Sequence, residues 1–444
     1  MSDPSNDPGQ DGGGAAAAAG DAAGFDRFTH FGGFDWARSE HQLVVVDPLG
    51  RIVLSLRFDD DAEGWALFRQ KVAAALGPSG CLAVAIETNC GPAVERLLAA
   101  GLTLYPLNPK AATRYRDRKA PAGSKDDALD AWSFADALRT DGRGWRPLLG
   151  QDPLTAELRL LCRDEVQLIG QRTALVNQLR AALCEYYPAA LDAFEDWTGE
   201  GPWRFVIAFP TPGELVKAGR RKWERFLHAH KLYRPQTAEQ RLATFAGAMT
   251  FAGPNPAVTR AKSLLAVTTA KQLCLLQSQL DEYRRRIAKL FDDHPDHDCF
   301  GSLPGAGAKL APRLLSELGA NRQVFASAQA LQNYAGTSPV TRQSGRSRAV
   351  AMRRACNKGL RATIHLWANL SRNTCVWAEV YYQKKRAGGM AHVAAIRCLG
   401  HRWMKILWKM WQTGTAYDEA LHLKNQTEHG SWVVQLLPPT APTP

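Results

Sequence analysis

The first patterned part of the chain, residues 26–150, alternates short apolar runs with longer amphipathic segments. Two runs rich in β-branched and aromatic residues flank the turn Asp47-Pro48-Leu49-Gly50, which is typical of a hairpin. A helix-like segment and a third apolar run, "CLAVAIETN", follow, and then helix, strand and helix again up to about residue 140. Strands in a meander followed by alternating helices and strands predict an α/β sheet domain.

The middle of the chain, residues 151–298, carries leucines at heptad spacing. One series predicts a long helix over residues 153–187 and a second predicts another over 257–291, with a small helical insertion at about 188–255 between them. Glu165 and Arg172 interrupt the first series and would fix the register of the pairing. The two helices could form a coiled coil with each other or with a second copy of the chain, and the leucine spacing is compatible with both.

Residues 299–425 return to helical periodicity. The run Pro304-Gly305-Ala306-Gly307 resembles a helix-hairpin-helix turn, whose backbone amides can face a phosphate, although the same run also occurs in plain loops. Three tryptophans at helical spacing are expected in the core rather than on a base-stacking surface: Trp403, Trp408 and Trp411. The Gly-, Ala- and Pro-rich residues 1–25 and the stretch 426–444 are expected to be tails.

Composition narrows the class of partner. The chain has 444 residues, of which 45% are hydrophobic, and a formal net charge of +12, which favours a polyanionic partner such as nucleic acid. Its nine cysteines are scattered singly, so neither a disulfide framework nor a thiolate zinc site is indicated. No run of 18 apolar residues occurs, and we expect no membrane partner.

Candidate chemistry begins with four carboxylates of the α/β domain. Asp35 is expected near the start of the first strand, Glu87 ends the run "LAVAIE", and Asp127 and Asp130 are three residues apart, which places them on one face of a helix. Like charges at that spacing repel unless a cation lies between them or water solvates them. Four convergent carboxylates could hold a pair of Mg²⁺ ions, or Mn²⁺, for phosphodiester transfer. Capping or solvated acids are the alternative reading for each residue alone.

A second candidate site is the segment "PVTRQSGRSRAVAMRRACNKGLR", residues 339–361. It contains Ser344 and no acid. Its cations are expected to bind nucleic acid: Arg342, Arg346, Arg348, Arg353, Arg354, Lys358 and Arg361. Without further information, Ser344 is a surface serine in a loop that holds a DNA backbone.

Six features in order resemble one family, the DEDD-type insertion-sequence transposases of the IS110 class, over roughly residues 28–415. They are "GFDWA" before a hairpin, "AIETN", "KDDALDA", the heptad helices, "LPGAGAKLAPRLLSELG" and "YAGTSPVTRQSG". The resemblance implies an RNase H-like (RuvC-like) N-terminal domain, an all-α remainder, and Asp35, Glu87, Asp127 and Asp130 as metal-binding catalytic acids. Asp126 departs from the family pattern, in which a small polar residue precedes the third acid.

For the C-terminal domain the resemblance implies that Ser344 attacks a DNA phosphodiester and holds the cut strand as a phosphoserine ester. Ser338 and Ser347 lie nearby, but neither is followed by Gly. Since the acids precede Ser344 by more than 200 residues, one active site would be assembled from two domains.

The resemblance further implies a bacterial transposase or recombinase that acts in the cytoplasm, associates with the nucleoid when active, and is guided by an RNA transcribed from the element. A homo-oligomer, dimer or tetramer, is expected through the coiled coil. Two alternatives stay open. One is a Holliday-junction-type endonuclease that uses metal-activated water, and the other is a non-catalytic nucleic-acid-binding scaffold.

Overall fold

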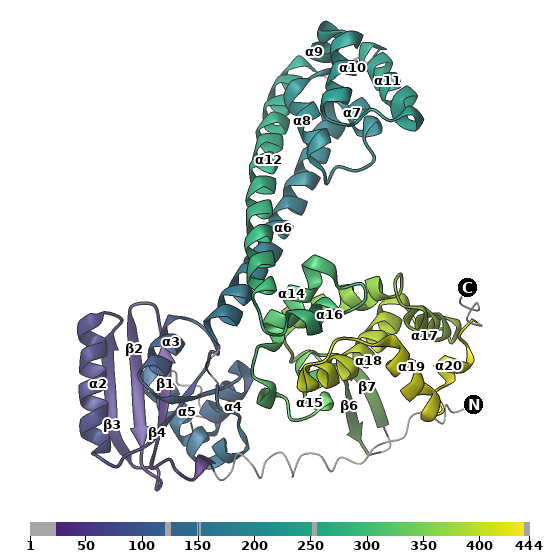
Figure 1. Cartoon of the computed structure of the whole chain (residues 1–444). Coiled ribbons are helices and arrows are strands. Elements are labelled where there is room, and N and C mark those ends of the chain that lie inside the picture. The colour runs from purple at the N-terminus through teal and green to yellow at the C-terminus, as the bar shows by residue number, and fades with distance from the viewer. Residues whose placement is uncertain are drawn as a thin grey trace. The chain divides into compact units, whose positions relative to one another are not determined.

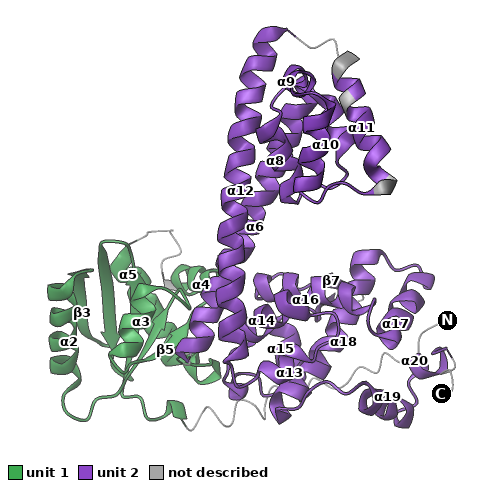
Figure 2. Cartoon of the chain, turned by 45° about the horizontal axis from the view of Figure 1, so that its top comes forward, with its two compact units in different colours: residues 1–150 green, residues 151–444 purple. Residues whose placement is uncertain are grey.

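The structure is a computed structural model and describes residues 24–119, 126–148, 150, 152–250, 255–345 and 347–438. The chain divides into two compact units, residues 1–150 and 151–444 (Figure 2). Most of the predicted N-terminal tail, residues 1–23, lies outside the described residues. Among the helices described, none has the length and apolar character that a membrane span requires.

Unit 1 is built on a mixed five-stranded sheet (Figure 1). The strand order is β3-β2-β1-β4-β5. β1 pairs antiparallel with β2 and β2 with β3, whereas β1 pairs parallel with β4 and β4 with β5. The strands are β1 (His30–Trp36), β2 (Glu40–Val46), β3 (Ile52–Asp59), β4 (Leu82–Ile86) and β5 (Thr103–Pro106). The predicted α/β class and the hairpin across Asp47–Gly50 are confirmed.

Helices cover both faces of this sheet. They are α2 (Ala62–Leu76), α3 (Pro92–Ala99), α4 (Pro109–Lys119), α5 (Asp127–Asp141) and the short η1 (Gly142–Gly144). Leu43 and Val45 of β2 pack in one core with α2 and α3, and Val44 and Val46 pack in the other with α4 and α5. The second core also contains Phe25, so the ordered domain begins just inside the predicted tail.

Two long helices, α6 (Pro153–Tyr186) and α12 (Pro256–Asp292), form the arm of unit 2. They run antiparallel, since Glu157 near the start of α6 pairs with Arg286, whereas Glu185 near its end pairs with Lys262. The two leucine series therefore pack against each other within one chain. Supercoiling of this pair and association with a second copy stay predictions, and an intermolecular contact would need another face of the arm.

The two charged interruptions of the first leucine series have partners. Glu165 is 2% exposed, and its carboxylate accepts hydrogen bonds from Arg284 Nε of α12 at 3.1 Å and from Arg313 of α14 (Gly307–Leu318) at 2.7 Å. Arg172 donates to the Gln277 side-chain oxygen at 2.8 Å. Both interruptions therefore make polar contacts across the helix pair, as expected for residues that fix its register.

A small helical cluster lies at the far end of the arm, between α6 and α12. It contains α7 (Pro188–Ala193), α8 (Glu200–Ala208), α9 (Pro212–Ala218), α10 (Arg220–Ala229) and α11 (Pro235–Thr250). Its core is aromatic, with Trp203, Phe205 and Trp223 fully buried.

The rest of unit 2 is mostly helical, as predicted. Its helices are α13 (His297–Gly301), α14 (Gly307–Leu318), η2 (Arg322–Val324), α15 (Ala328–Tyr334), α16 (Lys358–Ser371), α17 (Val376–Ala387), α18 (His392–Thr413), α19 (Glu419–Glu428) and α20 (Trp432–Gln435). A two-stranded sheet of β6 (Pro339–Ser344) and β7 (Ser347–Met352) was not predicted. Trp403 and Trp411 are fully buried and Trp408 is half-buried, which confirms their core role.

Two local features of this region qualify the sequence interpretation. An added Cβ on Gly305, which has φ +75°, would lie 2.7 Å from the Ser371 backbone nitrogen, so the Pro-Gly turn packs tightly on the end of α16. The prediction of a tail from residue 426 is wrong over the described part, because α19 extends to Glu428 and α20 follows it. There Val433 is buried and the Trp432 ring stacks on Tyr381 at 5.5 Å, which supplies the apolar contact that a tail lacks.

Candidate functional site

Two of the predicted acids lie where neighbouring parallel strands end. Phe34 of β1 pairs with Ile86 of β4. Asp35 comes next, near the end of β1 and not near the start of a strand as predicted, and Glu87 directly follows β4. Both side chains are half-buried. The parallel register therefore brings these two acids to the same edge of the sheet.

The close approach of α5 to β1 brings the other two acids toward this edge. An added Cβ on Gly33 would lie only 1.8 Å from the Ala131 carbonyl oxygen, so the strand touches the helix backbone there. Asp35 is two residues further along β1 and faces the same side of the sheet as Gly33.

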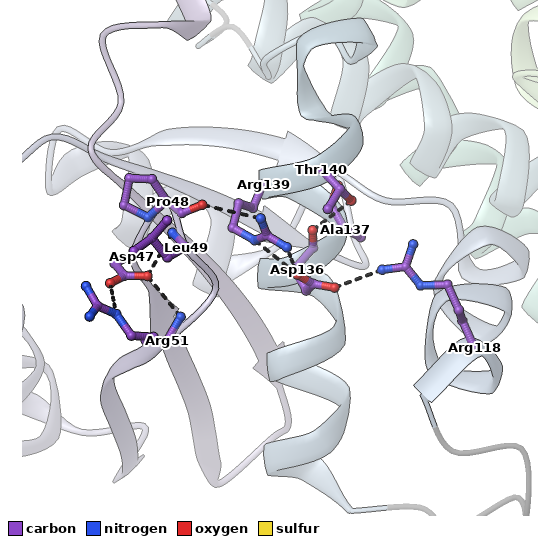
Figure 3. A network of polar contacts seen from close by, with 9 residues as sticks. All are labelled: Asp47, Pro48, Leu49, Arg51, Arg118, Asp136, Ala137, Arg139 and Thr140. Atoms are coloured by element: carbon purple, nitrogen blue, oxygen red, sulfur yellow. Dashed lines mark hydrogen bonds and ion pairs between the residues drawn. The ribbon is translucent and has the colours of Figure 1, made fainter.

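The direction of α5 determines which end of the helix lies near Asp35. Figure 3 shows Arg139, near the C-terminal end of α5, reaching the β2–β3 turn, where its guanidinium donates to the Pro48 carbonyl at 3.3 Å. That turn adjoins the beginning of β1, since Phe31 pairs with Val46. The first turn of α5, with Asp127 and Asp130, therefore lies toward the end of β1.

An arginine that was not predicted from the sequence lies beside these acids. Arg116 of α4 donates from one nitrogen to both oxygens of the Asp130 carboxylate, at 2.8 and 2.7 Å, and Asp130 is only 5% exposed. The hydrogen bond to Asp130 raises the pKa of Arg116, and the charges of Asp117 and Glu87 add to the effect. Arg116 thus lies within electrostatic range of two of the four predicted acids.

A second ion pair holds α4 beside α5. Arg118 donates to the buried Asp136 at 2.8 Å, and Arg139 donates to the other oxygen of the same carboxylate (Figure 3). Because Arg118 and Arg116 are two residues apart, this anchor helps to keep Arg116 near Asp130.

Arg57 of β3 is a second cation near the acids. It stands in the same register row as Asp35, with Gln42 of β2 between them. Its guanidinium pairs with Glu40 and lies 3.9 Å from the exposed carboxylate of Asp127. Its pKa is raised, first by the hydrogen bond to Glu40 and further by the charges of Asp127 and Asp126.

The four acids fit a divalent ion by chemistry but not by their present spacing. All supply hard carboxylate oxygens, the ligands that Mg²⁺ prefers. Over the residues that the structure describes, however, no three His, Cys, Asp or Glu side chains lie close enough to hold one metal ion together. Arg116 provides the positive charge beside Asp130 instead.

Ser344 lies at the tip of the β6–β7 hairpin in unit 2. It pairs with Ser347, so the connection consists of Gly345 and Arg346. Gly345 has φ +55°, a conformation that glycine adopts without strain in a two-residue hairpin turn. Arg346, one of the predicted DNA-binding residues, lies outside the described residues. Ser344 and nearly all of the hairpin are exposed to solvent.

Strand register separates the predicted arginines. Arg342 is two residues before Ser344 and therefore shares its face of the hairpin. Arg348 pairs with Gln343 and projects from the opposite face. Arg342 is consequently the arginine of β6 or β7 best placed to meet a phosphate at Ser344.

The competing serines differ in access. Ser338 is buried, and its hydroxyl accepts a hydrogen bond from the Gln329 amide nitrogen at 2.8 Å. Ser347 is exposed and stands directly across the hairpin from Ser344. A DNA strand could therefore reach Ser344 or Ser347 but not Ser338.

The remaining predicted cations lie on the segment that leads from the hairpin into α16 and on the first turn of α16. Arg354 and Lys358 are exposed, whereas Arg361 donates to the Arg353 carbonyl at 3.3 Å. Arg361 also borders a pocket of about 410 Å³, whose lining includes Met352 at the end of β7, Leu366 of α16 and Val393 of α18.

A buried acid outside the segment positions this connection. Glu317 of α14 accepts hydrogen bonds from Arg163 of α6, at 2.8 and 3.0 Å, and from Asn357 at 2.6 Å. Asn357 in turn caps α16 by accepting from the Leu360 amide. Burial alone would raise the pKa of Glu317, but the hydrogen bonds from Arg163 and Asn357 outweigh it and hold the pKa below its usual value.

The chain is similar to known transposases over most of its length. Residues 32–188 match the family model of DEDD transposases of the IS110 type, described as a transposase, and residues 297–383 match the model described as transposase IS116/IS110/IS902 family. The chain is 32% identical over 399 residues to the mini-circle putative transposase for IS117 of Streptomyces coelicolor, covering 89% of this chain and 96% of the relative. It is also 27% identical over 401 residues to the insertion element IS900 uncharacterized 42 kDa protein of Mycobacterium paratuberculosis, covering 87% of this chain and 97% of the relative.

Proposed function

The chain belongs to the IS110 family of insertion-sequence transposases, and from that premise we propose that it cuts and rejoins DNA with Ser344 as the nucleophile. Membership makes the chain a DNA transposase, and it implies the RNase H-like fold for the mixed sheet of unit 1. The observation that carries the proposal for Ser344 is its place at an exposed hairpin tip, with Arg342 on the same face.

The proposed chemistry is a phosphodiester transfer. Ser344 Oγ attacks the phosphorus and loses its proton to a general base, and the bond between phosphorus and one deoxyribose oxygen breaks. That oxygen takes up a proton and leaves as a free hydroxyl. Attack by a second strand's hydroxyl on the phosphoserine reverses the exchange and releases the serine. The Arg342 guanidinium would bind the non-bridging phosphate oxygens, for which its planar fork is suited.

Asp35, Glu87, Asp127 and Asp130 are proposed to hold Mg²⁺ or Mn²⁺. A bound divalent ion would supply positive charge for the phosphate oxygens of the reacting strand. For Asp130 to act as a ligand, Arg116 has to release its carboxylate. We propose that Arg116 neutralises this buried acid before a cation binds, because an unpaired buried carboxylate is costly.

The decisive experiment is covalent trapping. Full-length protein is incubated with element-end DNA and Mg²⁺, and denaturing electrophoresis then separates protein–DNA adducts. We expect Ser344→Ala to lose the adduct while it keeps nucleic-acid binding, since many phosphate contacts dominate affinity. Ser347→Ala is the matched control, because that hydroxyl lies across the same turn.

The other outcomes separate the alternatives. Cleavage without an adduct in the parent protein, unchanged in Ser344→Ala, would favour a Holliday-junction-type nuclease that uses water. Binding without any metal-dependent cleavage in the parent would favour the non-catalytic scaffold. An adduct that maps to the Ser347 peptide would contradict the assignment of Ser344.

Further parts of the proposal concern partners. We propose an element-encoded guide RNA, supported by the family resemblance and the net charge of +12, and a cytoplasmic site of action on nucleoid DNA. Addition of the flanking transcript should then stimulate adduct formation. A homo-oligomer is proposed through the exposed leucines of the arm, Leu160 of α6 and Leu264 and Leu275 of α12, and light scattering of variants with charged residues there would test it.

A further inference from the structure

The helical cluster at the end of the arm has no role in the chemistry above. Its helix α10 turns one side into the aromatic core, where Trp223 and Leu227 are fully buried. The opposite side carries Arg221, Lys222 and Arg225. Arg221 and Arg225 are four residues apart and therefore neighbours on the helix surface.

These three cations lack the partners that surface charges commonly have. Within the described residues no carboxylate forms an ion pair with any of them, whereas the adjacent Arg220 pairs with Glu224 at 3.0 Å. Seven Lys or Arg and only two Glu occur between residues 212 and 234. A solvated helix face more often mixes both signs, so this concentration of one sign favours a polyanionic ligand.

An exposed pair of rings adjoins the cations. His228, one turn beyond Arg225, stacks on Tyr233 with ring centroids 4.1 Å apart and planes inclined by 23°. Tyr233 is 40% exposed although it is a large aromatic residue. A flat, accessible ring beside unpaired cations is the combination with which proteins bind unpaired nucleotides.

We propose that α10 and the loop that follows it, residues 220–234, bind an unpaired DNA strand. Phosphates would contact Arg221, Lys222 and Arg225, and a base would stack on the His228–Tyr233 pair. DNA is chosen because the family acts on DNA, and an unpaired strand is chosen because the bases of a duplex are not free to stack on the rings. The inference does not depend on Ser344 or on the four acids.

Binding of a fluorescent single-stranded DNA oligomer to full-length protein, measured over a range of salt concentrations, tests the cations. Replacement of Arg221, Lys222 and Arg225 by Gln should reduce the dependence of log affinity on log salt by about 2, since each contact to a single strand contributes roughly 0.7. A control with the same loss of charge replaces three exposed lysines outside the cluster by Gln: Lys271, Lys405 and Lys409. This control should change the slope much less.

Tyr233→Ala tests the rings and leaves the charge unchanged. It should weaken single-stranded DNA binding about 5- to 150-fold, the usual range for loss of one stacked base, while duplex binding stays the same. Irradiation of an oligomer that contains 5-iodouracil should crosslink the parent protein within residues 220–234. At saturating DNA the Tyr233→Ala variant should still form the covalent adduct, which separates this proposal from that for Ser344.

Three results would overturn the inference. Equal slopes for the two triple variants would mean that only net charge matters. Crosslinks that all lie outside residues 220–234 would exclude the proposed contact. A larger loss for an RNA oligomer of the same sequence than for DNA would assign the surface to RNA instead.

Discussion

A single methyl group on Gly33 should disable the acid site. The Cβ of an alanine there would lie 1.8 Å from the Ala131 carbonyl oxygen and 2.5 Å from the Ala135 nitrogen. Both atoms belong to the α5 backbone, so no side chain can rotate away to make room. Since a carbon and an oxygen without a bond between them stay more than about 3 Å apart, α5 must move by more than about 1 Å.

The magnitude follows from this displacement. Overpacking a core by a methyl group costs about 1–3 kcal/mol, and a clash with two backbone atoms should reach the upper end of that range. The same movement shifts Asp127 and Asp130 relative to Asp35 and Glu87. A displacement of about 1 Å among catalytic groups can lower the rate about 100-fold.

Gly32→Ala is the matched control. The neighbouring glycine faces the other side of the sheet, where an added Cβ would meet only side-chain atoms at 3.3–3.4 Å. We expect its unfolding free energy to stay within about 1 kcal/mol of the parent, because lost backbone freedom in the unfolded chain offsets the tight contacts. Urea denaturation and metal-dependent DNA cleavage measure both variants. If Gly33→Ala matches Gly32→Ala in both assays, the contact between β1 and α5 is not what positions the acids.

Three further predictions concern charged groups. Asp130→Ala should abolish cleavage, while Arg116→Gln should lower the Mn²⁺ concentration needed for half-maximal cleavage; a higher requirement would mean that Arg116 orients Asp130 for the metal. Glu165→Ala leaves Arg313 without its buried carboxylate partner and should destabilise the protein by about 3–5 kcal/mol in urea denaturation, whereas a loss under 1 kcal/mol would contradict a structural role for that contact. Burial lowers the pKa of His422 to about 4, so the unfolded chain binds a proton that the folded chain refuses, and stability should fall as pH drops from about 6.5 toward 4 by up to about 3 kcal/mol. His422→Gln should flatten that part of the profile, and an unchanged pH dependence would refute the assignment.

Elements with strong local patterns could be predicted from the sequence. The β-branched run in "EHQLVVV" and the turn Asp47–Gly50 predict β2 and β3, and the leucine spacing predicts α6 and α12. Strand-end placement likewise pointed to Asp35 and Glu87. Their common edge depends on the parallel pairing of β1 with β4, which joins residues some 50 positions apart and leaves no local signal.

Neither α4 nor the β6–β7 hairpin has the apolar pattern from which helices and strands are predicted. α4 reads "PKAATRYRDRK", which has too few apolar residues for a helical stripe, and its contacts with α5 include the ion pairs of Arg116 and Arg118. The β6–β7 hairpin has nearly every residue exposed, so its strands lack the alternation of a half-buried sheet. The Ser344-Gly345 step was the available signal, since glycine in a two-residue loop between β-prone runs is typical of a hairpin.

The charged interruption at Glu165 has a consequence beyond the register of the arm. A leucine at position 165 would pack only against α12. The Glu165 carboxylate also binds Arg313 of α14, the helix that carries Glu317. Glu317 accepts from Arg163, two residues before Glu165, and from Asn357, the cap of the helix that follows the serine hairpin. The root of the arm and the base of the hairpin are thus joined through two buried carboxylates on facing helices. Because a buried carboxylate without its partners is costly, α6, α14 and the start of α16 should stay together when the arm binds a ligand.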